Sequence, residues 1–217
     1  MDRMTSGVMV LSKEHAAHRG LSQQFERGKV AKTYLAVVEG HMPADHGTID
    51  LPLGRVSGGG TILISAARDA RNPKPARTDF RVIERYESHT LVQATPFTGR
   101  VHQIRMHLAA AGFPIVGDEF YAAHGRIKDR GTDGIRRPSH DVGVCINSAD
   151  KSRSISHAAR HALHALRLCF EHPIGGLSMV FEARVPADIQ DLIAQLPGSG
   201  ASVEEAAVCT DSADYAG

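Results

Sequence analysis

A short polar connection between two strand-like segments restricts the fold of this chain more than any other sequence feature. Residues 78–85 and 90–95 are rich in β-branched and apolar side chains, and only the polar stretch 86–89 separates them. Strands joined this closely pair antiparallel, because a parallel pair requires a crossover of about a dozen or more residues. Alternating apolar residues on either side of a turn at 172–176 predict a second hairpin over about 166–185.

The rest of the chain adds strands and helices without regular alternation between them. Further strands are predicted at 8–11, 33–38 and 61–65, helices at 13–27, 101–111 and 189–196, and a basic, proline-containing loop at 68–77. Ser12 is expected to cap the first helix. Because strand and helix do not alternate steadily, a parallel βαβ fold is disfavoured. We therefore predict an α+β fold, with a mainly antiparallel mixed sheet and flanking helices.

Charge divides the chain into a basic body and an acidic end. Residues 197–217 contain four acidic residues and no Lys or Arg, so residues 1–196 carry a net charge of +5 although the whole chain has +1. This mild basic bias is compatible with a polyanionic partner. Residues 122–160 contain eight Lys or Arg and four acidic residues, with little periodicity. We predict a catalytic domain over 1–196 with a mobile basic insertion at 122–160, followed by a disordered acidic tail.

Several classes of protein are disfavoured by the sequence. No apolar run approaches the roughly 18 residues of a membrane span, and the three cysteines form no CxxC pair. A cytoplasmic location without a disulfide framework is therefore expected. His157, His161 and His164 have helical spacing, but no HExxH carboxylate accompanies them, so we predict no metal site. Ser6 lies outside any GxSxG motif, which argues against a serine hydrolase.

The stretch 98–121 concentrates polar side chains on a short predicted helix. Apolar residues recur there at spacings of three and four, which predicts one buried face: Val101, Ile104, Leu108 and Ala111. Gly112 is placed to end the helix, and Pro114 would prevent its continuation. Two interpretations are open on these residues alone. The helix either has a solvated polar face or presents Arg105 to a cleft.

Three further residue types suggest a reaction without defining it. Asp2 lies in a polar loop, Tyr34 in a predicted strand and Arg105 in the predicted helix. An arginine beside a carboxylate favours its ionised form, and an ionised aspartate can attack a sugar C1′ atom. Because any protein of this size contains an Asp, a Tyr and an Arg, these residue types alone carry little weight.

Several motifs, in order along the chain, resemble those of the RluA-type pseudouridine synthases. Residues 2–7 (DRMTSG) resemble the end of the family's HRLDxxTSG motif, and residues 32–40 (KTYLAVVEG) resemble its second motif. Residues 98–108 (TGRVHQIRMHL), with 114–118 (PIVGD) and Tyr121, are similar to its third. The later Leu-His-Ala and His-Pro elements resemble residues 163–165 and 172–173. The resemblance covers about residues 1–186, apart from the insertion.

The resemblance implies that the chain isomerises uridine to pseudouridine in ribosomal or transfer RNA, without cofactor or metal. Asp2 would be the catalytic carboxylate, Tyr34 would stack on the flipped base and assist proton removal from C5, and Arg105 would pair with the aspartate. The residues that we assign to substrate binding are Arg100, His102, Gln103, Leu163 and His164. The expected protein is a cytoplasmic monomer that binds RNA and no membrane.

The N-terminus departs from the family pattern. The His-Arg-Leu that should precede the aspartate is missing, and Met1 stands in the place of the leucine. We therefore expect an N-terminally truncated domain in which Asp2 is prone to fraying and activity is impaired. One alternative is a catalytically impaired, RNA-binding remnant of the same fold. The other is a hydrolase that uses Asp2, which would normally need a second, nearby carboxylate.

Overall fold

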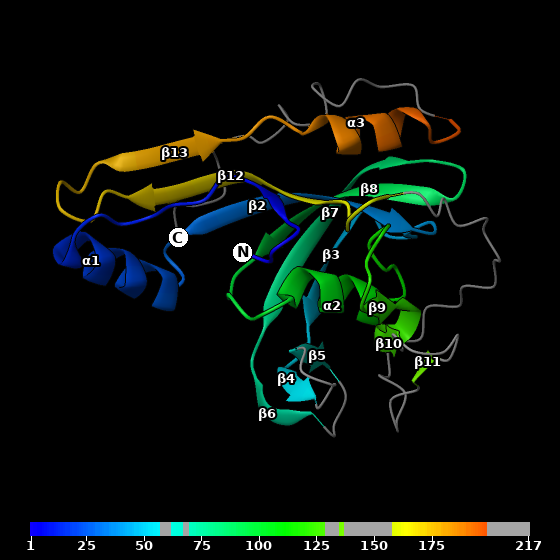
Figure 1. The fold of residues 1–217 in the computed structure, drawn as a ribbon, viewed down its shortest axis with the longest axis horizontal. Helices are drawn as coiled ribbons and strands as arrows, with labels where there is room; N and C mark the ends of the chain where they lie inside the picture. The colour runs from blue at the N-terminus through cyan, green and yellow to red at the C-terminus, as the bar shows by residue number, and fades with distance from the viewer. Residues whose placement is uncertain (57–61, 67–69, 129–134, 137–157, 199–217) are drawn as a thin grey trace.

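The computed structural model describes residues 1–56, 62–66, 70–128, 135–136 and 158–198 (Figure 1). Its central element is a seven-stranded sheet in the order β1-β12-β2-β8-β7-β3, with β13 pairing with β12 beyond the residues that pair with β1. The strands are β1 (Ser6–Gly7), β2 (Ala31–Glu39), β3 (His46–Asp50), β7 (Arg77–Arg85), β8 (His89–Pro96), β12 (Leu163–Glu171) and β13 (Ser178–Glu182). Every paired neighbour is antiparallel except β1 with β12, which confirms the predicted mainly antiparallel α+β fold.

Two small sheets and three α-helices complete the described structure. One sheet has the order β5-β4-β6, and the other has the order β11-β10-β9. Their strands are β4 (Leu53–Val56), β5 (Leu63–Ser65), β6 (Arg71–Lys74), β9 (Tyr121–Ala122), β10 (Arg126–Lys128) and β11 (Ile135–Arg136). The helices are α1 (His15–Glu26), α2 (Gln103–Ala110) and α3 (Ala187–Ala194), with a 3-10 turn at Ala123–Gly125. No helix among the described residues has both the length and the apolar character needed to cross a bilayer.

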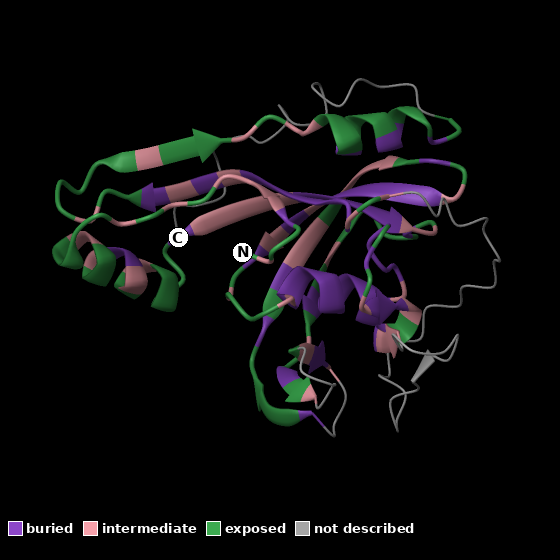
Figure 2. Cartoon of the chain, viewed as in Figure 1, coloured by how far each residue is buried: buried purple, intermediate pink, exposed green. Residues whose placement is uncertain are grey.

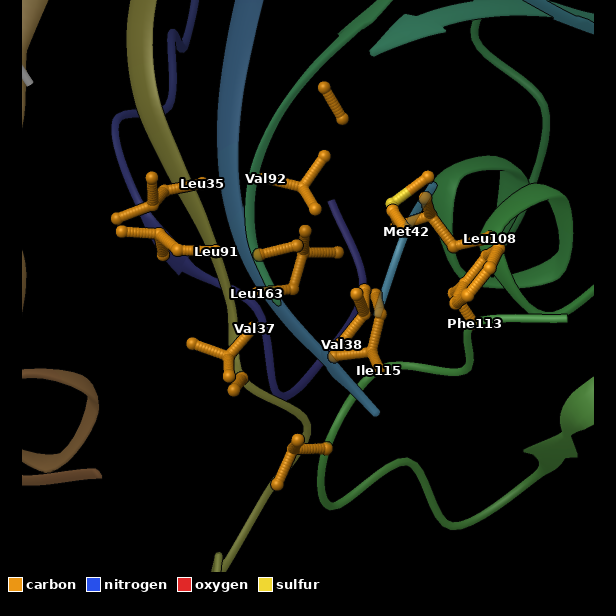
Figure 3. Packing of buried hydrophobic residues seen from close by; sticks show 14 of the residues in the cluster. Leu35, Val37, Val38, Met42, Leu91, Val92, Leu108, Phe113, Ile115 and Leu163 are labelled. Carbon is orange, nitrogen blue, oxygen red and sulfur yellow. The ribbon is translucent and has the colours of Figure 1, made fainter. Parts of the chain in front are cut away.

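The core lies on both faces of the central sheet. Residues 35–38 of β2 are all buried although successive side chains of a strand point to opposite faces, so both faces are covered. Figure 1 shows α2 and α3 on opposite sides of the sheet. In Figure 3, Met42, Leu108 and Phe113 converge between the sheet and α2, and Val38 lies beside Ile115. This packing fixes α2 against the strands that carry the functional residues.

Both predicted hairpins are present. β7 and β8 pair from Thr78↔Pro96 to Arg85↔Thr90, and the Tyr86 amide donates to the His89 carbonyl at 2.9 Å to close the turn. β12 and β13 form the second hairpin. Figure 2 shows β13 largely exposed, whereas α2 and most residues of β8 and β12 are buried. The sequence pattern therefore identified the pairing of both hairpins.

The predicted strand at 8–11 is wrong. The pairing segment is Ser6–Gly7, and the following residues run along the sheet edge with Met9 and Leu11 59% and 78% exposed. Val8 still donates its amide to the Ala165 carbonyl at 2.9 Å and packs against the core. The apolar run is explained by one-sided packing, because only alternate residues face protein.

Two other local predictions need correction. Helix α1 begins at His15 after Glu14 without any side-chain cap, and the Ser12 hydroxyl instead lies 3.4 Å from His18 Nδ1. The predicted loop at 68–77 contains strand β6. Its proline, Pro73, is accommodated because β6 pairs on one side only, at the edge of its small sheet.

Helix α2 is buried along its whole length rather than on one face. All eight of its residues are buried, whereas Val101, predicted on the apolar stripe, precedes the helix and is 44% exposed. A second cluster explains the difference, because Met106, Ala109 and Ala110 pack against the β4–β5 sheet and Tyr121. Long-range contacts therefore bury the faces that helical periodicity indicated as polar.

The predicted insertion and tail fall only partly within the described residues. Residues 121–128 form β9, the 3-10 turn and β10, and the 3-10 turn packs near the end of α2. Residues 129–134 and 137–157 of the insertion, and residues 199–217 of the tail, lie outside the described part of the chain. The predicted mobility of the insertion and disorder of the tail therefore stay predictions.

Candidate active site

The guanidinium group of Arg105 is held at three points inside the protein. Its side chain is 2% exposed, and Nε and Nη2 donate to the two oxygens of Asp118 at 2.7 and 2.8 Å. The third contact joins Nη1 to Asp2 Oδ2 at 3.1 Å. The guanidinium carbon also lies 5.1 and 5.2 Å from the ring centroids of Phe120 and Tyr121. Arg105 therefore has one fixed orientation, with one nitrogen directed at Asp2.

Charge compensation dominates the electrostatics of this pair. Burial would raise the pKa of Asp118, but the hydrogen bonds and charge of Arg105, with the Phe120 amide, outweigh burial and lower it. Burial would lower the pKa of Arg105, and the two carboxylates reverse that effect and raise it. Both groups therefore stay charged in a buried position, where an uncompensated charge would be costly.

Asp118 is the functional residue that residue-by-residue reasoning missed. Its carboxylate accepts the amides of Phe120 and Tyr121 at 2.8 and 3.2 Å besides binding Arg105. The preceding Gly117 has a φ of 73°, and a Cβ atom there would collide with the carbonyl group of Arg160. A signal was available, because a buried arginine requires a buried carboxylate and the resemblance already included the motif that ends at Asp118.

The loop that carries Asp2 is tied to the start of β12. The Thr5 hydroxyl lies 2.9 Å from His161 Nε2, and the Ser6 hydroxyl lies 2.9 Å from His164 Nδ1. Inside the loop, the Thr5 amide donates to the Asp2 carbonyl at 3.1 Å. The Asp2 side chain remains 20% exposed, so its carboxylate combines a fixed partner with access from outside.

Tyr34 lies on β2 beside the Asp2 loop. It pairs with Ala165 of β12 on one side, and Ala165 also pairs with Gly7 of β1. Burial, followed by the negative charge of Asp2, raises the pKa of the Tyr34 phenol. The structure thus brings together a reachable carboxylate, a neutral phenol and a buried cation, which are the three predicted catalytic residues.

Three of the predicted substrate-binding residues lie inside the protein. Gln103 donates to the Arg77 carbonyl and the Thr78 hydroxyl at 2.9 and 3.0 Å, and its oxygen accepts from the Thr98 hydroxyl and the Arg100 amide at 2.6 and 3.0 Å. His164 is 1% exposed and uses its other ring nitrogen, Nε2, at 3.1 Å from the Ala183 carbonyl. Leu163 is 3% exposed within the main core. This geometry favours a role for Gln103, Leu163 and His164 in positioning the surrounding backbone rather than in contacting substrate.

The other two predicted substrate-binding residues are accessible. Arg100 is exposed, and its Nε donates to the Pro75 carbonyl at 3.0 Å. His102 precedes α2 with a left-handed φ of 51°, and its Nδ1 lies 2.6 Å from the Tyr121 hydroxyl. Its ring stacks on Phe120 at a centroid distance of 5.8 Å. Both side chains are therefore accessible to a ligand, and His102 lies close enough to Asp2 to be influenced by its charge.

Three histidines, at positions 157, 161 and 164, have the spacing of possible metal ligands on one helix. His161 and His164 instead contact the hydroxyl groups of the N-terminal loop, and His157 lies outside the described residues. Burial, with the nearby charge of Arg105, lowers the pKa of His161 to about 4, so its ring is neutral near pH 7. Within the described ranges, no three His, Cys, Asp or Glu side chains converge as metal ligands would.

Comparison with known proteins gives one consistent result. Residues 1–110 match the family model described as RNA pseudouridylate synthase. Ribosomal large subunit pseudouridine synthase D of Neisseria meningitidis serogroup A is 36% identical over 196 residues, which are 90% of this chain and 46% of the relative. An uncharacterized RNA pseudouridine synthase of Bacillus subtilis is 34% identical over 200 residues, which are 92% of this chain and 55% of the relative. The chain thus spans about half the length of these curated relatives.

Solved structures show the same likeness. The structure of human RNA pseudouridylate synthase domain containing 1 superposes with a TM-score of 0.60 at 28% identity. The match covers 85% of this chain and 66% of the human chain. A human protein named RNA pseudouridylate synthase domain containing 4, with 22% identity and a TM-score of 0.61, shares the fold.

Proposed function

This chain belongs to the RNA pseudouridylate synthase family, and from that premise we propose that it isomerises uridine to pseudouridine in RNA. The observation that carries the proposal is the contact between Arg105 and Asp2. Arg105 is buried and held by Asp118, so it fixes a carboxylate that is still reachable from outside. Burial, followed by the charge of Asp2, raises the pKa of the Tyr34 phenol, so the neutral phenol lies near this carboxylate.

The proposed reaction begins at Asp2. Arg105 contacts Oδ2, and Oδ1 accepts no hydrogen bond from the described residues, which leaves Oδ1 for the ribose. In the direct route, Oδ1 bonds to C1′ as the N1–C1′ bond breaks, and the glycosidic electron pair goes to uracil N1. An alternative route in which Asp2 acts without that bond leads to the same product. Arg105 balances the charge of the carboxylate in either case.

Tyr34 would act on the base after it has turned. When C5 bonds to C1′, the Asp2 oxygen is released, C5 loses its proton and N1 gains one, so the product is an isomer of the substrate. This balance requires no oxidant, reductant or co-substrate. The ring of Tyr34 can stack on uracil. Its raised pKa keeps the hydroxyl protonated near neutral pH, so in a relay the phenol oxygen would accept the C5 proton while its own proton passes to water.

The substrate that we propose to test first is ribosomal RNA. The Neisseria relative is named for the ribosomal large subunit, and transfer RNA is the second candidate. The target base must leave its stack before Asp2 can reach C1′. The basic bias of residues 1–196 and the exposed Arg100 suit a phosphate backbone. We also propose a cytoplasmic protein that acts as a monomer, which size-exclusion chromatography with light scattering would test.

Release of tritium from RNA labelled at uridine C5 tests the proposal directly. The wild-type chain is expected to release tritium from ribosomal or transfer RNA, and Asp2→Asn should abolish the release. Asp45→Asn, which changes an exposed loop carboxylate, serves as the matched control and should retain activity. Binding of RNA without release would support the catalytically impaired remnant instead, and free uracil would support the hydrolase.

A further inference from the structure

We propose that Arg160 and Asp188 form a clasp that positions the Asp2 loop for catalysis. Asp188 lies in the first turn of α3, 186 residues from Asp2 along the chain, and it has no place in the proposed reaction itself. The clasp would make the C-terminal helix part of the active-site framework. As a statement about catalysis, it rests on the proposed synthase activity.

Arg160 joins the N-terminal loop to α3 through one guanidinium group. Its Nη1 donates to the Met4 carbonyl at 3.0 Å, and its Nη2 donates to the Ser6 hydroxyl at 3.1 Å. Nε and Nη2 also bind the two Asp188 oxygens at 2.7 and 3.0 Å. Two parallel hydrogen bonds between a guanidinium and a carboxylate fix the plane of the guanidinium, so Asp188 determines where Nη1 points.

Asp188 is well placed to act as the anchor of the clasp. The hydrophobic residues Ile189, Leu192 and Ile193 of α3 are buried in the main core, so the helix is fixed to the sheet. The Arg160 side chain is 15% exposed and the Asp188 side chain is 50% exposed. An ordinary pair of that exposure would add little to stability. The Arg160–Asp188 pair differs from an ordinary surface ion pair because Arg160 also contacts the loop that carries Asp2.

The backbone of Arg160 lies against the turn that carries Asp118, the other carboxylate of the site. Gly117, next to Asp118, approaches the Arg160 carbonyl so closely that no Cβ atom would fit. The side chain of Arg160 meanwhile holds residues 4 and 6 of the Asp2 loop. One residue therefore sets the spacing between the loop of Asp2 and the turn of Asp118, the two partners of Arg105.

Two histidines close to Arg160 in the sequence also contact the same loop directly. His161 and His164 contact the hydroxyls of Thr5 and Ser6, each at 2.9 Å. These contacts fix the loop against β12, whereas Arg160 links it to α3 through Asp188. Loss of the clasp should therefore loosen the loop without unfolding the domain, which allows a local effect to be measured.

Kinetics of three variants test the positioning role. Asp188→Asn should lower kcat by about 10-fold or more with KM within about twofold, because a displacement of roughly 1 Å can cost on the order of 100-fold in rate. Asp188→Glu, which retains a carboxylate, should recover most of the loss. The matched control is Asp45→Asn, since Arg85 likewise joins Asp45 to a backbone carbonyl, that of Met42, with 2.7 Å contacts. An Asp188→Asn variant with the kcat of the control would overturn the proposal.

Hydrogen exchange provides a readout that does not depend on activity. Amides of residues 2–8 should exchange faster in Asp188→Asn than in the wild type, while those of β7 and β8 keep their rates. Faster exchange throughout the chain, or unchanged exchange at 2–8, would contradict the clasp, as would faster exchange with unaltered kcat. If the wild type releases no tritium, the proposed function fails, and the exchange experiment still decides whether Asp188 holds the loop.

Discussion

Asp118 binds Arg105 through two hydrogen bonds of 2.7 and 2.8 Å and leaves the third guanidinium nitrogen for Asp2. The two carboxylates differ in exposure, at 1% for Asp118 and 20% for Asp2. The buried one compensates the charge of the arginine, and the accessible one can meet substrate. We therefore predict that substitution of Asp118 mainly lowers the stability of the protein, whereas substitution of Asp2 mainly lowers its activity.

Asp118→Asn is expected to lower the free energy of unfolding by about 3–5 kcal/mol, because it leaves the buried Arg105 charge poorly compensated. Asp2→Asn should change that free energy by less than about 1 kcal/mol, since its pair is partly solvated. Urea titration followed by circular dichroism measures both values. Equal destabilisation by the two variants would show that Asp118 is not the main partner of the arginine.

Tyr34→Phe tests the role of the Tyr34 hydroxyl, because the substitution removes the hydroxyl and retains the ring. The hydroxyl forms no hydrogen bond with the described residues, so its removal should leave stability nearly unchanged. If the hydroxyl relays the C5 proton, kcat should fall by about 100-fold or more, while the ring still stacks and KM is retained. Tritium release under single-turnover conditions measures the rate, and a kcat close to the wild-type value would exclude the hydroxyl from the reaction.

Gln103→Leu tests whether Gln103 binds substrate or supports the site. The substitution removes four hydrogen bonds from a buried position, and each unsatisfied buried group costs about 1–3 kcal/mol, so we expect a loss of at least about 2 kcal/mol. KM of the folded fraction should be unchanged. Gln24→Leu is the matched control, because Gln24 also makes two backbone hydrogen bonds, at 2.8 and 3.0 Å to Glu171, but in an exposed position. A raised KM with normal stability would instead support direct binding.

His161 should make stability depend on pH. Burial and then Arg105 lower its folded-state pKa to about 4, whereas an unfolded histidine titrates near 6.5. The unfolded chain therefore binds more protons between these values, and stability is lost as pH falls from about 6.5 to about 4. The contribution reaches at most about 1.4 kcal/mol per pH unit.

His161→Gln removes this titration while an amide can still contact the Thr5 hydroxyl. Urea midpoints measured from pH 7 to pH 4.5 should fall less steeply in the variant than in the wild type. Part of the slope should persist, because burial also lowers the pKa values of His89, His107 and His164. Identical slopes in the two proteins would mean that His161 is protonated equally in the folded and unfolded chains.

Features that depend on neighbouring residues could be predicted from the amino-acid sequence. The four-residue connection at 86–89 predicted the β7–β8 hairpin, and β-branched residues predicted β2. The motifs identified Asp2 and Arg105, which the structure places 3.1 Å apart although 103 residues separate them. Local pattern was sufficient there because turn length and side-chain alternation act over a few residues.

The groups that surround those residues come from distant segments of the chain, and no local sequence pattern indicated their contacts. It placed Asp118 against Arg105, buried Gln103 in its own hydrogen-bond network, and brought Arg160 and Asp188 to the Asp2 loop. It also covered every side of α2, where periodicity indicated one buried face. Contacts of this kind join segments far apart in the chain, and the free energy of a buried ion pair or hydrogen bond depends on what excludes water from it, which no local spacing records.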